Sequence, residues 1–250
     1  MGRILSALYS TVAYLIFLGT FVHAIGFVEN IVVPKTIDSG EAGDALGAVL
    51  VNLALLGLFA VQHSVMARQG FKRMWTRIVP EAAERSTYVL FSSLALGLLL
   101  WQWRPLPALV WSTDGVVAIA ITAVSWFGWA MVLASTFLIS HFHLFGVTQG
   151  FARLLKRHMP EQEFTTPFLY RWLRHPLYAG FILAFWAAPQ MSVGHLLFAV
   201  ATTGYILIGI WLEERDLVAQ FGQRYLQYRA AVGPWVPFLP VLTDHELPRS

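Results

Sequence analysis

The sequence predicts an all-α integral membrane protein with five to six transmembrane helices and a cytosolic amphipathic segment at the C-terminal end. Charged residues make up 12% of the 250 residues, whereas 57% are hydrophobic. Soluble domains carry about a quarter charged residues, so this chain has too few to cover a surface that faces water. Apolar runs of the length that a bilayer requires also recur along the chain.

Six hydrophobic segments divide the chain. They cover residues 9–28, 46–62, 88–103, 116–139, 177–188 and 193–212. A membrane helix needs about 20 residues, which the fourth and sixth segments reach and the second and third reach with slight extension. The first lacks a small-residue cleavage site and is expected to be a retained helix. The fifth segment is too short to span a membrane as a helix. We expect it to be the first arm of a tight helical hairpin with the sixth segment, and to be short, tilted or packed against protein.

The distribution of Lys and Arg predicts the orientation. Fifteen of the 17 basic residues fall before the first segment, after the last one, or in the loops on the same side. Loops rich in Lys and Arg remain in the cytoplasm. We therefore expect both termini to be cytoplasmic, and the net charge of +3 is explained by topology without a nucleic-acid partner.

The composition also restricts the chemistry. The chain has no cysteine, which excludes disulfides, thiolate metal sites and a cysteine nucleophile. No repeat or linker divides the sequence, so residues 1–250 are interpreted as a single membrane domain. Within it, residues 1–139 supply the N-terminal helices and residues 140–250 the catalytic core.

Several polar side chains lie at membrane depth near the cytoplasmic side: Gln62 and His63 after the second segment, and His141, His143 and Gln149 after the fourth. A charge at a helix centre costs about 2.5 to 3.5 kcal/mol, so such groups generally face protein or a cavity. His141 and His143 are two residues apart and point to different helix faces, unlike the i, i+4 pairs that bind zinc, so no metal is expected. An interfacial histidine bonded to a carbonyl is the alternative for His63 or His141.

The two ends of the hairpin carry the remaining candidates. Arg174 and His175 precede Pro176, and the first turn of a helix that starts there offers free N–H groups to an anion. Glu213 and Glu214 follow the sixth segment directly. A basic flank at one end and a solvated acidic terminus at the other explain these residues without any function.

A helix that continues past the sixth segment forms an amphipathic stripe. The stripe contains Glu213, Leu217, Phe221, Tyr225 and Tyr228, at spacings of four and three residues. Gly222 within this helix indicates a bend or a close approach. The proline-rich stretch over 232–240 cannot be regular helix and is expected to lie at the interface or to cover a pocket.

Together these C-terminal motifs resemble the isoprenylcysteine carboxyl methyltransferase family. The resemblance rests on about 75 residues, from Arg174-His175-Pro176-Leu177-Tyr178 through Glu213-Glu214 and Phe221-Gly222-x-x-Tyr225-x-x-Tyr228 to the proline-rich stretch. Earlier motifs are similar to a bacterial branch of that superfamily that methylates methanethiol to dimethyl sulfide, and NnrU-type membrane proteins share some of them. These motifs are Val61-Gln62-His63-Ser64, Pro80-x-x-x-Glu84-Arg85-Ser86-Thr87-Tyr88, Trp101-Gln102-Trp103 and His141-Phe142-His143-Leu144-Phe145-Gly146.

The resemblance implies a bacterial inner-membrane enzyme that uses S-adenosylmethionine, bound within about 170–240 beneath the C-terminal segment. The residues that the resemblance and their chemistry assign to the cofactor are Arg174, His175, Tyr178, Glu213, Glu214, Tyr225 and Tyr228. Carboxylates accept from ribose hydroxyls or the ammonium, and aromatic rings flank adenine or the sulfonium. The contact that each glutamate makes stays open.

The implied reaction is methyl transfer to a small thiol. An alkyl thiol is mostly protonated at neutral pH, so a base is useful. His63 and His141 are the first candidates and His143 the third, because imidazole accepts a proton near neutrality. The thiol offers few groups for an enzyme to bind, so a small dry pocket is expected. The expected substrate contacts are Trp75, Phe142 and Gln149.

Two other functions fit the same sequence. A methyltransferase acting on a lipid or a prenylcysteine-type substrate needs a lateral tunnel between helices, whereas a methanethiol site is closed and small. The second alternative is a small-solute transporter or a scaffold without enzymatic activity. Charged residues that continue to mid-membrane would favour transport, but the polar groups here lie mainly toward one side.

Overall fold

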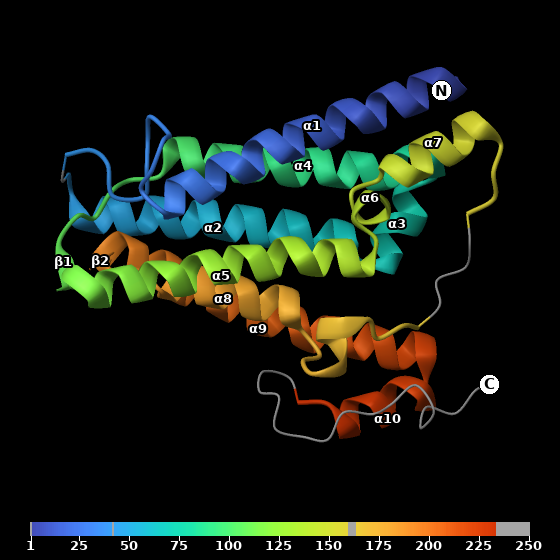
Figure 1. Ribbon diagram of the computed structural model, residues 1–250. Helices are drawn as coiled ribbons and strands as arrows, with labels where there is room; N and C mark the ends of the chain where they lie inside the picture. Colours follow the sequence, from blue (N-terminus) through green and yellow to red (C-terminus); the bar gives the residue numbers. More distant parts are fainter. Residues whose placement is uncertain (1, 42, 160–163, 234–250) are drawn as a thin grey trace.

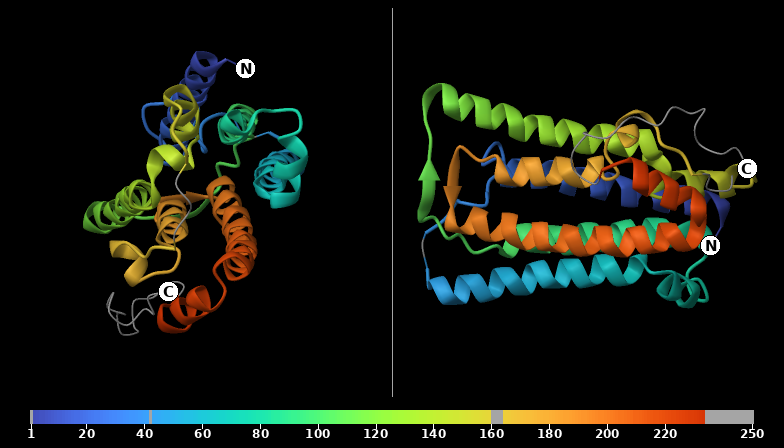
Figure 2. Two further views of the ribbon diagram at one scale, coloured as in Figure 1. Left: turned by 90° about the vertical axis from the view of Figure 1, so that its right-hand side faces the viewer. Right: turned by 90° about the horizontal axis from the view of Figure 1, so that it is seen from below.

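The computed structural model describes residues 2–41, 43–159 and 164–233 as an elongated bundle of helices (Figure 1). The long elements run along one axis, as the view from below in Figure 2 shows. They are α1 (Arg3–Val28), α2 (Ala45–Ala67), α4 (Glu81–Gln102), α5 (Gly115–Ile139), α8 (Pro176–Trp186) and α9 (Val193–Phe221). The shorter ones are α3 (Gln69–Trp75), α6 (His141–Leu144), α7 (Val147–Leu155), α10 (Gln223–Ala231), the 3₁₀ turn η1 (Phe168–Arg171), and strands β1 (Leu109–Ser112) and β2 (Gln190–Ser192).

Four helices in the described part of the chain, α1, α2, α5 and α9, are long and apolar enough to cross a membrane. Only 17% to 33% of the residues in their apolar windows are buried inside the protein. Large apolar side chains therefore cover the outside of the bundle, and a bilayer is the solvent that accommodates them. The prediction of a multi-pass helical membrane protein is confirmed.

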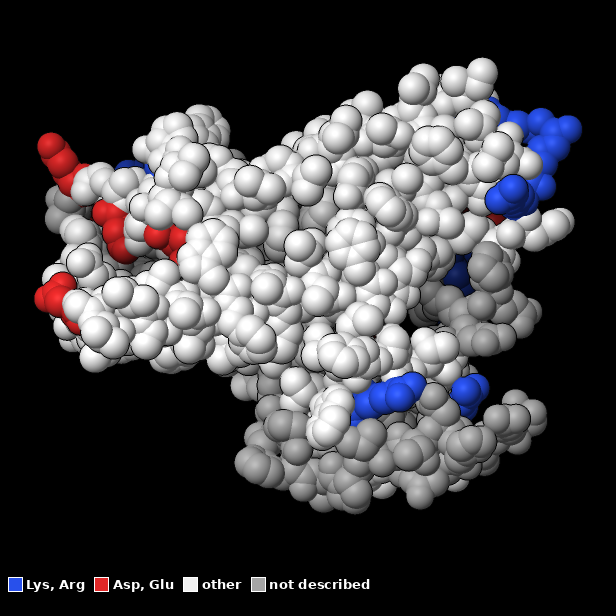
Figure 3. Space-filling model, in the orientation of Figure 1, with Lys and Arg blue, Asp and Glu red and all other residues white. Residues whose placement is uncertain are grey.

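Charge divides the two ends of the bundle. In Figure 3 the acidic side chains gather at the end that carries β1 and β2, whereas Lys and Arg gather at the end where α1 begins and α10 lies. The middle is an uncharged band. The clustering of Lys and Arg at one end agrees with the count of basic residues along the sequence.

Most helix boundaries agree with the predicted segments, but α4 begins seven residues before the predicted start at Tyr88. Its first turn carries Glu81 and Glu84. These carboxylates favour a helix N-terminus because the helix dipole is positive there. An apolar count detects only the later turns, so it places the start too late.

The contact between α5 and α8 is close because glycine stands on both sides of it. A Cβ atom on Gly128 would lie 2.6 Å from the Gly180 carbonyl oxygen and 2.7 Å from the Ala184 nitrogen. Two helices approach this closely only where small residues face each other. The short α8 is thus held against α5 within the bundle, as expected for an arm packed against protein.

A two-stranded antiparallel sheet, which the sequence did not predict, closes the end opposite the basic loops. Strand β2 occupies the turn of the α8–α9 hairpin and pairs with β1, with Trp111 opposite Met191. Beside this end, the core contains Trp103 and Phe27, both fully buried. Three or four residues are too few to produce a strand pattern in the sequence, so only the pairing reveals them.

The helical continuation past the last apolar segment agrees with the prediction. Helix α9 runs to Phe221, and Gly222 then adopts φ +55° and ψ −128°, so that α10 turns back. The expected bend at this glycine is confirmed. The apolar stripe packs around the buried ring of Phe164 and forms a separate small core with Tyr225 and Tyr228. The proline-rich stretch from residue 234 lies outside the described residues.

The glycine contact between α5 and α8 gives a stability prediction. The Gly128→Ala variant should lose about 1 to 3 kcal/mol of unfolding free energy, because the atoms that its Cβ meets belong to the backbone of α8. Thermal unfolding in detergent measures the change. Gly204→Ala in α9 is the matched control, because a Cβ there meets nothing within 4 Å. Equal melting temperatures for the two variants would contradict the close contact.

Candidate functional site

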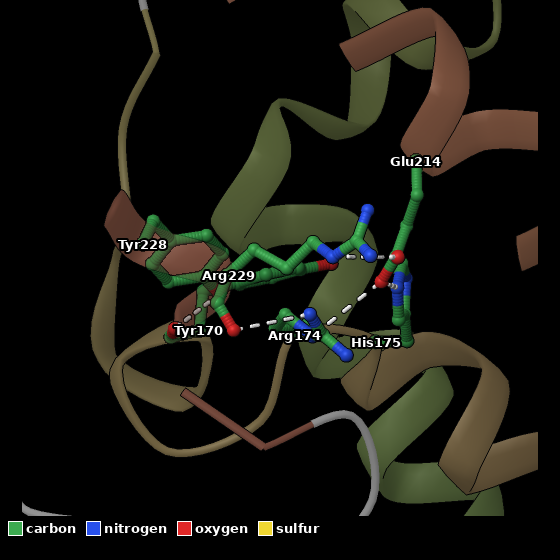
Figure 4. A network of polar contacts seen from close by, with 6 residues as sticks. All are labelled: Tyr170, Arg174, His175, Glu214, Tyr228 and Arg229. Atoms are coloured by element: carbon green, nitrogen blue, oxygen red, sulfur yellow. Dashed lines mark hydrogen bonds and ion pairs between the residues drawn. The ribbon is translucent and has the colours of Figure 1, made fainter. Parts of the chain in front are cut away.

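A network around the Glu214 carboxylate joins three segments at the basic end of the bundle (Figure 4). Glu214 Oε1 lies 3.0 Å from His175 Nε2 and 3.4 Å from Arg174 Nε, and Oε2 lies 3.7 Å from Arg229 Nε. His175 is buried, and both Glu214 and Arg174 are mostly enclosed. Both carboxylate oxygens are therefore held by cationic or hydrogen-bonding partners within the protein.

Local structure explains how these residues meet. Pro176 starts α8, which places His175 at the N-cap, directly beside the incoming Arg174. Helix α10 returns toward the same point after the bend, and the Arg174 side chain donates to the Arg229 carbonyl oxygen at 3.2 Å. The Tyr228 hydroxyl donates to the Tyr170 carbonyl oxygen at 2.6 Å. The tail is thus tied to the segment that precedes α8.

Beside this network, Glu213 Oε2 on α9 and the Tyr225 hydroxyl oxygen on α10 are buried and lack a hydrogen-bond partner within the described structure. The Glu213 carboxylate lies next to the Tyr178 hydroxyl, and Tyr225 interacts electrostatically with both glutamates. A buried polar atom without a partner is costly unless a ligand or water satisfies it. These atoms therefore fit a polar ligand that carries hydroxyl or ammonium donors.

Burial raises the pKa of Tyr225 and of Tyr228, and the neighbouring carboxylate of Glu214 raises it further in both residues. Both phenols consequently stay protonated in the physiological range and can donate hydrogen bonds. Tyr228 uses its hydroxyl within the protein, whereas that of Tyr225 stays available.

A second polar group surrounds His63 on α2. Its Nε2 shares a hydrogen bond of 2.7 Å with the Tyr88 hydroxyl, and its Nδ1 one of 3.2 Å with the Ser92 hydroxyl. The imidazole stacks on Phe59, and the Tyr205 ring meets it edge-on with centroids 6.4 Å apart. Helices α2, α4 and α9 thus supply one polar cluster inside the bundle.

Tyrosines connect the two groups. The Tyr178 hydroxyl lies beside Glu213 and is close enough to Tyr88 and Tyr205 for electrostatic interaction. Tyr178 therefore interacts electrostatically with residues of both groups, and within the second group Tyr88 contacts His63 directly.

His141 lies elsewhere, between α1 and α5. Its Nε2 bonds the Tyr14 hydroxyl at 2.9 Å, its Nδ1 bonds Thr136 at 2.8 Å, and its ring stacks on Phe137 with centroids 4.3 Å apart. The residue is buried, and desolvation lowers its pKa. Both ring nitrogens are engaged by neighbours, as both ring nitrogens of His63 are.

His143 faces a polar cavity of about 190 Å³ at the basic end. The cavity is lined by Lys72, Glu81, Glu84, Arg85, Ile139, Ser140, His143, Leu144 and Gln149. Partial burial lowers the pKa of His143, and the charge of Arg85 lowers it further. The Gln149 Oε1 atom is buried without a partner in the described structure.

Within the described residues, the three predicted substrate contacts have different surroundings. Gln149 lines the polar cavity, whereas Phe142 is 51% exposed and packs against Tyr14 and His141. Trp75 stacks on Phe71, with its indole nitrogen buried and unbonded in the described structure. The predicted cofactor residues, in contrast, all lie at or near the Glu214 network.

Sequence reasoning missed Tyr88, Tyr205, Arg229 and Tyr170. Tyr88 closes the Pro80–Tyr88 motif, so a signal for it was present. Arg229 follows Tyr228, but only the bend at Gly222 determines that it reaches Glu214. Tyr170 contributes its backbone carbonyl to Tyr228, which side-chain chemistry does not reveal. In the described residues, no group of three or more His, Asp or Glu side chains is placed to hold a metal ion.

Comparison with known proteins identifies relatives over nearly the whole chain. The chain is 52% identical over 239 residues to a methanethiol S-methyltransferase of Mycobacterium tuberculosis, covering 95% of this chain and 98% of the relative. It is 53% identical over 237 residues to methanethiol S-methyltransferase 1 of Bradyrhizobium diazoefficiens, covering 94% and 83%. The chain belongs to the methanethiol S-methyltransferase family.

A more distant similarity extends beyond this family of bacterial relatives. A Nurim homolog of Drosophila pseudoobscura pseudoobscura is 28% identical over 187 residues, covering 70% of this chain and 72% of that protein. No family model matches the chain. No solved structure matches it.

The environments of the histidines predict an acid-sensitive fold for this member of the family. An unfolded imidazole titrates near pH 6.5, and burial lowers the folded pKa of His143 below that value. As pH falls through about 6.5, the unfolded chain binds protons that the folded chain refuses, so the unfolding free energy declines. Melting temperatures between pH 7.5 and 5.5 should fall less in His143→Gln than in the unmodified protein.

The exposed His158 supplies the control for this measurement. His158→Gln should show the same dependence of melting temperature on pH as the unmodified protein. An unchanged slope in His143→Gln would contradict a contribution from the partly buried imidazole.

Proposed function

We propose that the protein transfers a methyl group from S-adenosylmethionine to methanethiol and forms dimethyl sulfide. The observation that supports this most strongly is the identity of about 50% to proteins named methanethiol S-methyltransferase, over at least 94% of the chain. The structure is consistent with the proposal, because buried polar atoms are available for a ligand and His63 is surrounded by aromatic rings.

The unpaired atoms beside the Glu214 network supply the proposed cofactor site. Glu213 Oε2 and the Tyr225 hydroxyl are free to bond the polar groups of a nucleoside or an amino acid. Glu214 is already engaged by three partners, so it positions Arg174, His175 and Arg229 around the ligand. S-adenosylmethionine supplies a methyl group activated by its sulfonium, which leaves the protein to align the acceptor and to remove a proton.

We assign the base to the His63 cluster among the three candidate histidines. Tyr178, which lies beside Glu213, leads through Tyr88 to His63. His141 is enclosed between α1 and α5 by Tyr14 and Thr136. His143 faces the polar cavity, where no aromatic side chain contributes to the lining. A small apolar thiol fits the aromatic rings around His63 better than the polar cavity beside His143.

The proposed location is the bacterial inner membrane with both termini in the cytoplasm. The clustering of Lys and Arg at one end supports that orientation. It places the Glu214 network on the cytoplasmic side, where the cofactor is made available.

An activity assay tests the function and the division of roles. Purified protein with labelled S-adenosylmethionine is offered methanethiol, hydrogen sulfide or a prenylcysteine, and volatile product is measured in the headspace. We expect dimethyl sulfide from methanethiol. Methylation of the prenylcysteine alone would favour the lipid-type alternative and refute the proposed substrate.

Variants in the same assay separate binding from turnover. Glu213→Gln and His175→Ala should weaken S-adenosylmethionine binding, measured by calorimetry or filter binding. His63→Gln should retain binding and lose about 10² to 10⁴-fold in kcat, the usual contribution of a general base. Unchanged cofactor affinity in both of the first two variants would contradict the proposed cofactor site.

The absence of cysteine makes the orientation directly testable. Asp114→Cys and Arg157→Cys each place a single thiol at an exposed position at opposite ends of the bundle. In intact spheroplasts, a membrane-impermeant maleimide should label Cys at 114 and reach Cys at 157 only after lysis. The reverse pattern would refute cytoplasmic termini.

A further inference from the structure

Neighbouring hydroxyl groups occupy both ring nitrogens of the His63 imidazole, and one of them is the phenol of Tyr88. The Tyr88 hydroxyl lies 2.7 Å from His63 Nε2, and the Ser92 hydroxyl lies 3.2 Å from Nδ1. Neither ring nitrogen is therefore left to meet a substrate directly. The Tyr88 side chain is buried, and its ring contacts that of His63 with centroids 5.1 Å apart.

The phenol oxygen, in contrast, lies against His63 Nε2 at 2.7 Å and keeps acceptor capacity of its own. Tyr88 is close enough to Tyr178 for electrostatic interaction, and Tyr178 lies beside Glu213 in the proposed cofactor site. A hydroxyl that donates its hydrogen to an imidazole keeps two lone pairs, and one of them can accept a proton from a thiol.

A cation stands against the same phenol. The Arg85 guanidinium lies 5.0 Å from the centre of the Tyr88 ring, and its Nε donates to the Leu144 carbonyl oxygen at 2.7 Å. The guanidinium is thus fixed beside the ring. A positive charge held there stabilises negative charge that develops on the phenol oxygen during proton transfer.

We propose that Tyr88 is the residue that accepts the proton of the thiol, and that His63 acts through it. This inference rests on the proposed methylation of methanethiol. In the assigned tautomer, His63 Nδ1–H donates to Ser92, and Nε2 accepts from the Tyr88 hydroxyl. The thiol S–H bond breaks and its proton joins the Tyr88 oxygen, while the hydroxyl proton of Tyr88 moves to His63 Nε2.

The electrons balance in one displacement. The thiol sulfur uses the electron pair of its former S–H bond to form the new bond to the methyl carbon. The bond from that carbon to the sulfonium breaks, and its electron pair stays on the departing neutral sulfide. His63 holds one extra proton, which returns through Tyr88 to water when the products leave. No oxidant or reductant is required.

The test compares Tyr88→Phe with the unmodified protein in the full-length chain. We expect kcat with methanethiol at pH 7 to fall about 10² to 10⁴-fold, as for loss of a proton acceptor. The deficit should shrink as pH rises, because solvent then supplies the thiolate. It should also be smaller for hydrogen sulfide, which is more acidic than methanethiol. Binding of S-adenosylmethionine should stay unchanged.

A double-variant cycle tests whether His63 and Tyr88 act as one unit. If they share the proton, Tyr88→Phe combined with His63→Gln should cost about as much kcat as either change alone, because contacting residues are non-additive. Losses that multiply in the double variant would show that the two residues act separately and would overturn the relay.

Tyr14→Phe is the matched control, because the Tyr14 hydroxyl bonds His141 Nε2 at 2.9 Å in a second Tyr–His pair. This variant should keep the pH dependence of the unmodified protein. A Tyr88→Phe deficit that is equal at every pH and for every thiol would indicate a structural role and refute the proposal, as would no deficit at all. If the unmodified protein makes no dimethyl sulfide, the proposed function itself fails.

Discussion

The Glu214 carboxylate is the contact on which the rest of the site depends. It meets Arg174 and His175 at the start of α8 and Arg229 on α10, so a single side chain of α9 connects the start of α8 with α10. Opposite charges attract each other more strongly in such partly enclosed surroundings than in bulk water. The aromatic core around Phe164 and the hydrogen bonds from Tyr228 to Tyr170 and from Arg174 to Arg229 hold α10 at the same place.

The bilayer explains why polar side chains inside the bundle occur as connected sets. Water is absent from the hydrocarbon region, so each polar group must find a partner within the protein. His63, Tyr88 and Ser92 satisfy one another across α2 and α4, and Tyr14 and His141 do the same between α1 and α6. A catalytic group in this setting is therefore part of a network, and its reactivity depends on the neighbours that share its protons.

Much of the fold follows from the sequence, because apolar length and basic loops report directly on bilayer insertion. The bend at Gly222 and the apolar stripe of α10 were also predictable, since a glycine interrupts a clear helical period. The β1–β2 pairing was not, because each strand is shorter than the period that would reveal it. The network around Glu214 was half predictable: Arg174 and His175 belong to a motif, whereas the approach of Arg229 depends on the direction in which α10 leaves the bend.

The sequence pattern alone does not distinguish two of the candidate histidines, His63 and His141. His63 and His141 each stand at the basic end of an apolar segment, and each forms a hydrogen bond to a tyrosine hydroxyl and a second bond to a Ser or Thr hydroxyl. Local sequence and local contacts therefore treat them as equals. The difference is that Tyr88, the partner of His63, interacts electrostatically with Tyr178. The packing of α4, α8 and α9 determines which Tyr–His pair lies toward the proposed cofactor site. That position distinguishes the proposed proton relay of Tyr88 and His63 from the pair of Tyr14 and His141.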